Sequence, residues 1–423
     1  MRARAVAVLM IVGLVAVACG NEESSGGGSG GGRPGVTDTE IRVGGVVGKT
    51  NPVGRPYEDG FVGVKAYFDM INAEGGVFGR DLELVAERDD QSQASRNVQQ
   101  VRALVEEDNV FAVLPVVTQI FAGAGYLVDQ GVPTFGWNIN VEWSQGENLF
   151  GEKGSFLCFD CPSLHPVYVA QQVGATRAAV FAYGQSPQST DCAEGVKNGF
   201  DAFGPELAFE DTSLAFGFTD LSAAVAEIRD QGVDFIATCM DINGNANIAQ
   251  AVRDAGIELK GVYSPEGYAQ DVLDDLGDKI DGFYFGAAFV PFEEPQPPEG
   301  MQQYLAAMEE LGQTPSEQGL AGWINAALLV AGIEAAGEDF TQESVIDSIN
   351  ELTDFTADGI VPAQDWTKLH EADPRSDGCT AIVQVQGGEF VPVFGEPGKP
   401  FVCFENNQVE KTGPPDLSNP TIQ

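Results

Sequence analysis

Hydrophobic and polar positions along the chain predict strands and helices in turn. Residues 41–47, IRVGGVV, form a short apolar run that is typical of a buried strand. The next segment carries apolar residues at spacings of three, four and three, which form one stripe of a helix: Phe61, Val64, Phe68 and Ile71. The stripe stops at Gly75-Gly76, a common C-terminal helix signal.

This alternation continues as far as residue 136. Further strands are predicted at residues 82–87, 110–117 and 132–136, with a helix over roughly 95–107 and another before Val132. The run VFAVLPVV at 110–117 is apolar throughout, as a parallel strand covered on both faces should be. These elements predict one doubly wound α/β lobe.

A second series of the same kind then begins. Strands are predicted at residues 177–184, 233–239, 260–264 and 282–292, with helices from about Asp191, around Leu221 and after residue 239. The proline-rich stretch 291–300 interrupts the series, and three helical patterns follow near 301–311, 319–336 and 342–352. A β-rich tail spans 379–404. The predicted fold class is α/β, with two doubly wound, Rossmann-like lobes.

The N-terminus has a different character. Arg2 and Arg4 precede a short apolar stretch, which is too short to cross a bilayer and is typical of a secretory signal peptide over residues 1–18. The sequence AVAC, ending at Cys19, resembles a bacterial lipobox and predicts lipidation of that cysteine; secretion with Cys19 incidental is the alternative. The Gly/Ser-rich residues 19–36 form the expected tether, and about 17 such residues span roughly 23 Å.

The chain has 7 cysteines, and six remain if Cys19 carries lipid. An even number outside the cytoplasm favours disulfides. We predict the pairs that join neighbours in the expected order of elements: Cys158–Cys161, Cys192–Cys239 and Cys379–Cys403. The motif CFDC also suggests thioredoxin chemistry, but it does not open a helix after a strand, so a structural role is favoured.

The charge is strongly unbalanced, with 63 acidic against 22 basic residues among 423. No basic footprint for nucleic acid exists, and docking on an anionic membrane surface is disfavoured. Solubility at the cell surface explains this charge without a cationic partner. With 43% hydrophobic residues, the part after the tether can form about two domains.

Candidate binding residues follow from the strand ends. In open parallel sheets, ligands lie beyond the carboxyl ends of strands, where helix N-termini present free amides. The polar or aromatic residues at those positions are Thr118, Gln119, Trp137, Asn138, Gln188, Asp241 and Glu266.

Residues 51–119 resemble the N-terminal lobe of branched-chain amino-acid-binding proteins, which are extracytoplasmic receptors of ABC importers with the type I periplasmic-binding-protein fold. The segment INAEGGVFGR at 71–80 and the pair Asp89-Asp90 carry the resemblance most strongly. It implies two lobes joined by three crossings, near Cys158, Val290 and Gly359. Lobe 1 would then comprise residues 37–157 and 291–358, and lobe 2 residues 158–290 and 359–423.

The resemblance also implies roles for single residues. Glu266, in YSPEGY, matches the family's glutamate for the ligand's α-ammonium; a solvated loop acid is the alternative. Thr118 lies near the family's hydroxyl residue for the ligand carboxylate, although a helix cap would use the same hydroxyl. Tyr57 lies within one residue of a cleft tyrosine, with surface packing as the alternative. Trp137 replaces small residues, and near Asp241 the stacking tyrosine is missing, so the branched-chain ligand does not carry over.

Other motifs do not support catalysis or metal binding. GGVVGKT at 44–50 lacks the first glycine of a phosphate loop, and DINGNAN at 241–247 lacks usable calcium ligands at its sixth and twelfth positions. The chain has 2 histidines, His165 and His370, and no G-x-S-x-G motif, which argues against a zinc site or a serine triad. We expect no cofactor, no metal and no enzymatic activity.

The leading hypothesis is a lipid-anchored solute receptor, a monomer that closes over a small zwitterion and passes it to an ABC permease in the membrane. The second is a sensory ectodomain that reports its ligand to a signalling partner. An exported glycosidase is a distant third, because the order of elements does not match an eight-fold barrel.

Overall fold

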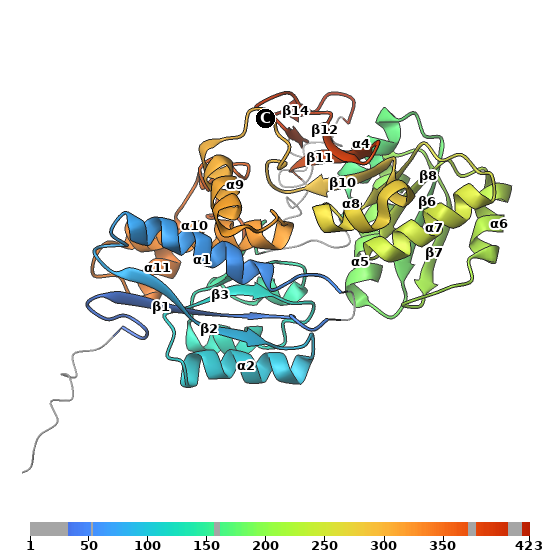
Figure 1. Cartoon of the computed structure of the whole chain (residues 1–423). Coiled ribbons are helices and arrows are strands. Elements are labelled where there is room, and N and C mark those ends of the chain that lie inside the picture. Colours follow the sequence, from blue (N-terminus) through green and yellow to red (C-terminus); the bar gives the residue numbers. More distant parts are fainter. Residues whose placement is uncertain (1–32, 52–53, 156–160, 371–377, 405–416) are drawn as a thin grey trace, which may run out of the picture. The chain divides into compact units, whose positions relative to one another are not determined.

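The computed structural model describes residues 33–51, 54–155, 161–370, 378–404 and 417–423. Within them the chain forms two lobes, each built on its own sheet (Figure 1). The lobe 1 sheet has the order β2-β1-β3-β4-β5, and its strand pairs are parallel. Its strands are β1 (Glu40–Val47), β2 (Asp81–Asp89), β3 (Ala112–Val117), β4 (Thr134–Gly136) and β5 (Leu149–Gly151).

Helices cover both faces of this sheet, as its buried strands require. On one face lie α2 (Ala94–Glu106), α3 (Ala124–Gln130) and the short η1 (Val141–Gln145), which share a core with β1 and β3. On the other face lie α1 (Asp59–Ala73) and α10 (Glu317–Ala336), with α9 (Glu299–Leu311) against α1 and α11 (Gln342–Asn350) against α10. Figure 1 shows α1 and α2 on opposite sides of the sheet.

The contact between α1 and α10 depends on glycine. A Cβ atom on Gly63 would lie 1.7 Å from the carbonyl oxygen of Gly319, so the two backbones touch where no side chain fits. At the start of both helices, Ser316 Oγ donates to Asp59 Oδ2 at 2.7 Å. The two helix N-termini are therefore held side by side.

The lobe 2 sheet has, among the described residues, nine strands in the order β14-β13-β11-β10-β9-β8-β6-β7, with β12 paired to β11. Strands β6 to β10 pair in parallel, and the tail strands add antiparallel pairs. The strands are β6 (Arg177–Tyr183), β7 (Glu206–Leu214), β8 (Phe235–Cys239), β9 (Gly261–Ser264), β10 (Phe283–Ala287), β11 (Cys379–Gln386), β12 (Glu389–Val393), β13 (Phe401–Cys403) and β14 (Thr421–Ile422).

Helices again cover both faces of this sheet. α4 (Leu164–Gln172) and α5 (Pro187–Phe203) share a core with β6 and β8 on one face. The remaining helices contribute to the larger core: α6 (Ser222–Gln231), α7 (Ile242–Asp254), α8 (Gln270–Leu276) and η2 (Gly277–Ile280). Sequence analysis missed the edge strand β7, because no alternation of apolar and polar residues marks it; only partly buried positions do.

Two of the predicted disulfides are confirmed. Cys192–Cys239 links α5 to the end of β8, so Cys192 lies on a helix and not at a strand end. Cys379 and Cys403 are directly opposed on the antiparallel strands β11 and β13. Cys161 is also disulfide-bonded. Cys158, its predicted partner, lies outside the described residues, as do the signal peptide and Cys19.

The chain passes between the lobes after β10. Val290 N donates to the carbonyl of Ile360 at 2.8 Å, so a second segment lies beside this passage. The residues that follow stay with lobe 1: Trp366 packs edge-on against Phe150 of β5, and Ser155 N donates to the carbonyl of residue 369. Contacts thus assign residues 359–370 to lobe 1, and the boundary expected at Gly359 comes too early.

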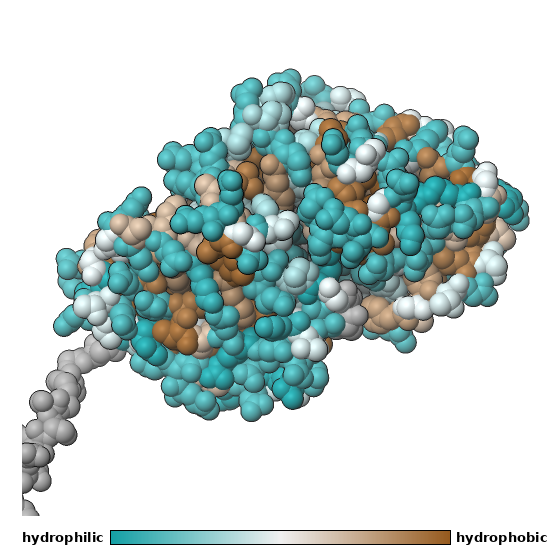
Figure 2. Space-filling view, in the orientation of Figure 1, coloured by the Kyte–Doolittle hydropathy of each residue, from teal (hydrophilic) through white to brown (hydrophobic). Residues whose placement is uncertain are grey.

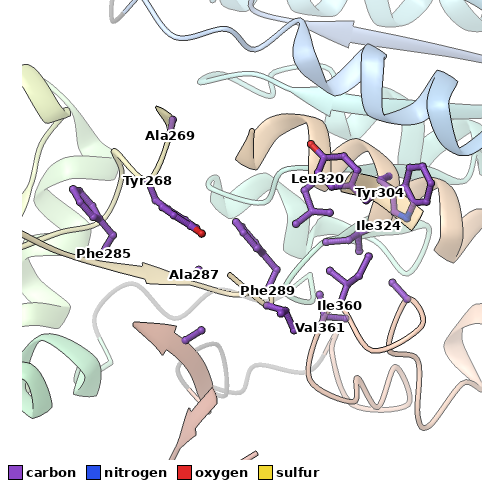
Figure 3. Packing of buried hydrophobic residues seen from close by; sticks show 14 of the residues in the cluster. Tyr268, Ala269, Phe285, Ala287, Phe289, Tyr304, Leu320, Ile324, Ile360 and Val361 are labelled. Atoms are coloured by element: carbon purple, nitrogen blue, oxygen red, sulfur yellow. The ribbon is translucent and has the colours of Figure 1, made fainter. Parts of the chain in front are cut away.

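Aromatic residues fill the region around Val290. Tyr268 of lobe 2 stacks on Phe292 with a centroid distance of 5.3 Å, and Phe292 stacks on Tyr304 of α9 at 6.1 Å. Tyr268 Oη accepts from Phe292 N at 2.7 Å and donates to Glu293. Figure 3 shows Tyr268 and Phe289 between the lobe 2 strand and the side chains of α9 and α10. This packing makes one continuous apolar core across the hinge.

The visible surface is largely hydrophilic, with scattered apolar residues (Figure 2). Among the described residues, one helix, α10, is long and apolar enough to cross a membrane. Most of it is buried between α1, α11 and the lobe 1 sheet, as expected for the central helix of a lobe.

Candidate functional site

Charged, amide and aromatic side chains from both lobes influence one another near the carboxyl ends of the parallel strands. We call this set the interlobe cluster. From lobe 1 it contains Arg55, Tyr57, Gln119, Trp137, Glu152, Lys153 and Glu317, and from lobe 2 Tyr183, Gln188, Asp241 and Glu266. Two surface cavities, of about 270 and 330 Å³, lie elsewhere, against α2 and beside β12.

Glu266 follows β9, and the turn that carries it is fixed by hydrogen bonds. Ser264 Oγ donates to the Glu266 carbonyl at 2.7 Å, and Asn245 Nδ2 donates to Ser264 Oγ at 2.7 Å. The next residue, Gly267, has φ +124°, and a Cβ atom there would lie 2.8 Å from side-chain atoms of Ile242 and Phe285. Only glycine fits this position, which explains the PEG sequence around the carboxylate.

Burial raises the pKa of the Glu266 carboxyl group to about 7. The guanidinium of Arg55 lowers this pKa in part, and the carboxylates of Asp241 and Glu317 raise it further. Arg55 and Glu317 belong to lobe 1, so the charge on Glu266 is set by both lobes. A partly buried carboxylate in this setting is poised to take a cation.

Arg55 is the cation of lobe 1 that acts on Glu266. Asn51 positions its backbone, with Nδ2 donating to the Arg55 carbonyl at 2.8 Å and Oδ1 accepting from Arg55 N at 3.1 Å. The Arg55 side chain is 8% exposed, and its ion pair with Asp271 of α8 is long, at 3.8 Å. Asp271 is 59% exposed, so this pair holds the guanidinium only weakly.

Tyr57 and Trp137 form the aromatic part of the cluster. Their ring centroids are 5.3 Å apart, and their exposed fractions are 1% and 8%. Burial raises the pKa of Tyr57, and the carboxylates of Glu266 and Glu317 raise it further, while a hydrogen bond with Gln119 lowers it. The phenol is therefore neutral and donates hydrogen bonds. Tyr57 and Trp137 thus lie together, as part of one aromatic wall.

A second carboxylate group lies on lobe 1. Glu317 is the first residue of α10, and Glu152 follows β5. Burial raises the pKa of Glu152 to about 7; Lys153 lowers it in part, through an ion pair of 3.3 Å, and Glu317 raises it. Burial also raises the pKa of Glu317, against the effects of Lys153 and Arg55. Glu317 is thus coupled to Glu266 across the lobes and to Glu152 within lobe 1.

Three predicted site residues use their side chains within their own lobe. Thr118 Oγ1 accepts from Ile120 N at 3.4 Å and also bonds the buried Asp90, so its hydroxyl serves the turn after β3. Asn138 Nδ2 donates to the Gly154 carbonyl. Their hydroxyl and amide groups position backbone that leads to the cluster.

Asp241 is likewise used as a helix cap. It caps α7, accepting from Asn243 N at 2.9 Å and from Gly244 N at 3.3 Å, and its second oxygen accepts from Tyr183 Oη. This arrangement agrees with the reading of residues 241–247 as a loop leading into a helix. Among the described residues, no group of acidic, histidine and cysteine side chains is arranged to hold a metal ion.

Gln188 joins the lobes directly. It lies in the first turn of α5, and its Nε2 donates to the Gln119 carbonyl at 3.3 Å and to Asn140 Oδ1 at 3.4 Å. Gln119 carries the hydrogen bond to Tyr57, so Gln188 is linked through one residue to the aromatic wall.

Sequence reasoning missed several members of the cluster, namely Arg55, Glu152, Lys153, Tyr183 and Glu317. Glu317 is 51 residues beyond Glu266 in a helix that returns to lobe 1, and only its place at a helix start, after Ser316, gave a signal. Arg55 lies in a loop beside a tyrosine that was found, but nothing in its spacing marks it.

This geometry is matched by known proteins. A family model described as periplasmic binding protein matches residues 40–389. The chain belongs to the periplasmic binding protein family. Members of this family bind solutes and catalyse no reaction, which agrees with the absence of an expected catalytic motif in the sequence. A comparison with curated proteins found no match.

Solved structures of similar fold come from several bacteria. The substrate-binding protein LivJ from Streptococcus pneumoniae, in complex with isoleucine, is 17% identical with a TM-score of 0.67 over 84% of this chain and 100% of that one. A solute-binding protein from R. palustris, in complex with benzoate, is 17% identical with a TM-score of 0.65, covering 86% and 98%. A fatty acid ABC transporter substrate-binding protein from Thermomonospora curvata is 18% identical with a TM-score of 0.65, covering 85% and 93%. The family member described here therefore has the two-lobed type I fold.

Proposed function

We propose that this protein is the extracytoplasmic solute-binding component of an ABC importer and holds a small amino acid, or a related amine or amide, between its lobes. One observation carries the proposal: Glu266 of lobe 2 shares its electrostatic environment with Arg55 and Glu317 of lobe 1. A carboxylate and a guanidinium from opposite lobes match the ammonium and carboxylate of a zwitterion.

The geometry around these charges supports the same conclusion. The cluster lies beyond the carboxyl ends of β3, β4, β8 and β9, where open α/β sheets bind ligands. Few polar contacts join the lobes there, and two of them are the weak hydrogen bonds of Gln188. Separation of the lobes therefore breaks little, while the aromatic packing around Tyr268 keeps them connected at the hinge.

The relatives favour transport of a solute but leave its chemistry open. The similar structures were solved with isoleucine or benzoate, or are described as fatty acid binders. The polar residues of the cluster favour an amine-bearing compound over a fatty acid, because a charged group desolvated against a hydrocarbon chain would have no partner.

We further propose that Cys19 carries lipid and holds the protein at the outer face of the cell membrane, next to its permease. The sequence AVAC at 16–19 and the Gly/Ser-rich segment after it support this anchor. Mass spectrometry of the mature N-terminus is the test. A diacylglyceryl group on Cys19 is expected, and an unmodified N-terminus at another residue would overturn the anchor without affecting the binding proposal.

Solute binding is tested on the purified protein by native mass spectrometry and by thermal shifts against a panel of amino acids, amides, urea-like compounds and aromatic acids. A bound solute raises the unfolding midpoint by mass action. We expect amine-bearing amino acids or their amides to give the largest shifts. If aromatic acids alone shift the midpoint, the assignment of Glu266 to an ammonium is wrong; if no compound binds, the receptor function itself is refuted.

A further inference from the structure

The interlobe cluster has one more carboxylate than a simple zwitterion needs. Glu152, Glu266 and Glu317 supply three carboxylates, against the two cations Arg55 and Lys153. Glu152 already has Lys153 as its ion-pair partner at 3.3 Å. No ion pair of 4.0 Å or less is seen for Glu266 or Glu317 among the described residues. Two carboxylates therefore face a single guanidinium.

Asp241 does not change this balance. Its two oxygens are occupied by the N-terminus of α7 and by the Tyr183 hydroxyl, so its charge is compensated within lobe 2. Asp59, beside Glu317 in space, is likewise engaged by the Ser316 hydroxyl. Glu266 and Glu317 remain as the carboxylates that await a cation.

The two glutamates lie on different lobes and still act on each other. The charge of Glu317 raises the pKa of Glu266, and it also raises the pKa of Tyr57, so all three side chains face the same region. In a zwitterion complex, Arg55 would take the carboxylate and Glu266 the α-ammonium. Glu317 would then be desolvated without a partner, which is strongly unfavourable.

We propose that the solute is an amino acid with a positively charged side chain, and that Glu317 of lobe 1 binds that charge. This inference rests on the proposed function and names its solute class. An ammonium or guanidinium at the end of the side chain neutralises the second carboxylate as the lobes close. An apolar side chain would instead leave Glu317 buried beside hydrocarbon.

Titration calorimetry at pH 8 with lysine and norleucine tests the inference, because these two probes differ only by the terminal ammonium in place of a methyl group. Lysine should bind at least about tenfold more tightly than norleucine. Glu317→Gln should reduce the affinity for lysine by about tenfold or more and leave that for norleucine unchanged or improved. Exposed Glu310 on α9 provides the control Glu310→Gln, which should alter neither affinity. Denaturation of ligand-free Glu317→Gln checks that the fold is intact.

Other outcomes decide the matter as well. Equal or tighter binding of norleucine, or an unchanged lysine-to-norleucine ratio in a folded Glu317→Gln variant, would overturn the inference. If the wide solute panel reveals a ligand but neither lysine nor arginine binds, the inference fails while the receptor function stands. Cadaverine, which lacks the carboxylate, should bind much more weakly than lysine; equal affinities would show that the solute is a diamine and not an amino acid.

Discussion

Replacement of Glu266 by glutamine should stabilise the ligand-free protein and abolish binding of its amine ligand. Burial and the carboxylates of Asp241 and Glu317 raise the pKa of Glu266 from 4.5 to about 7, despite Arg55. Between these two values the folded state binds a proton that the unfolded state does not. The contribution of Glu266 to the free energy of unfolding is therefore complete below the unfolded pKa and is lost as the pH rises through about 7.

The size of this effect follows from the pKa difference. Each pKa unit corresponds to about 1.4 kcal/mol, so the ionised carboxylate costs the ligand-free fold on the order of 3 kcal/mol at pH 8. Glutamine keeps the shape of the side chain and removes the charge. The variant should thus gain up to about 3 kcal/mol at pH 8 and almost nothing near pH 4.5. Its affinity for an amine ligand should fall by about two orders of magnitude, because the ammonium loses its buried partner.

Urea denaturation of both proteins at several pH values between 4.5 and 8 measures this difference. The exposed control Glu310→Gln should stay within about 0.5 kcal/mol of the unmodified chain throughout. A constant difference between Glu266→Gln and the unmodified chain at all pH values would refute the electrostatic account. So would unchanged ligand affinity in a folded variant.

Three further changes test the fold around the site. Gly63→Ala forces a Cβ atom against the Gly319 carbonyl and should lower the free energy of unfolding by about 3 kcal/mol, whereas Gly125→Ala in α3, which has room, should be neutral or slightly stabilising in the same denaturation series. Loss of the Cys192–Cys239 disulfide by paired alanine substitution opens a 47-residue loop and should cost about 4 kcal/mol, seen as a lower urea midpoint; no change would show that the bond is dispensable. Tyr268→Phe leaves the amide of Phe292 without its acceptor and should cost about 1–2 kcal/mol by the same assay, with an unchanged midpoint counting against the hinge contact.

The order of elements could be predicted from the sequence because periodicity is local. Buried parallel strands such as residues 112–117 are apolar on both faces, and helices such as α1 carry one stripe, so each is visible in a short window. The edge strand β7 has neither feature. The passage between lobes near Gly359 was placed too early because its left-handed φ of +90° marks a turn within lobe 1, and the burial of Trp366 that keeps the chain there is a long-range contact.

The candidate site could be predicted only in part, for the same reason. Glu266, Tyr57 and Trp137 follow strands or belong to recognisable motifs, and the structure brings them into one electrostatic environment or one aromatic contact. Thr118 was found by position, but its hydroxyl is already used by the turn after β3. Glu317 reaches the cluster only because Gly63 and Gly319 let two distant helices touch, and no short stretch of sequence records that approach. Whether each predicted residue contacts a solute stays a prediction.

A crystal structure of the protein with its solute tests the central claim most directly. We predict that the solute lies between the lobes, with an ammonium group within hydrogen-bond distance of Glu266 and the remainder against Tyr57 and Arg55 of lobe 1. A solute held by one lobe alone, or on an outer face away from Glu266, would contradict the account.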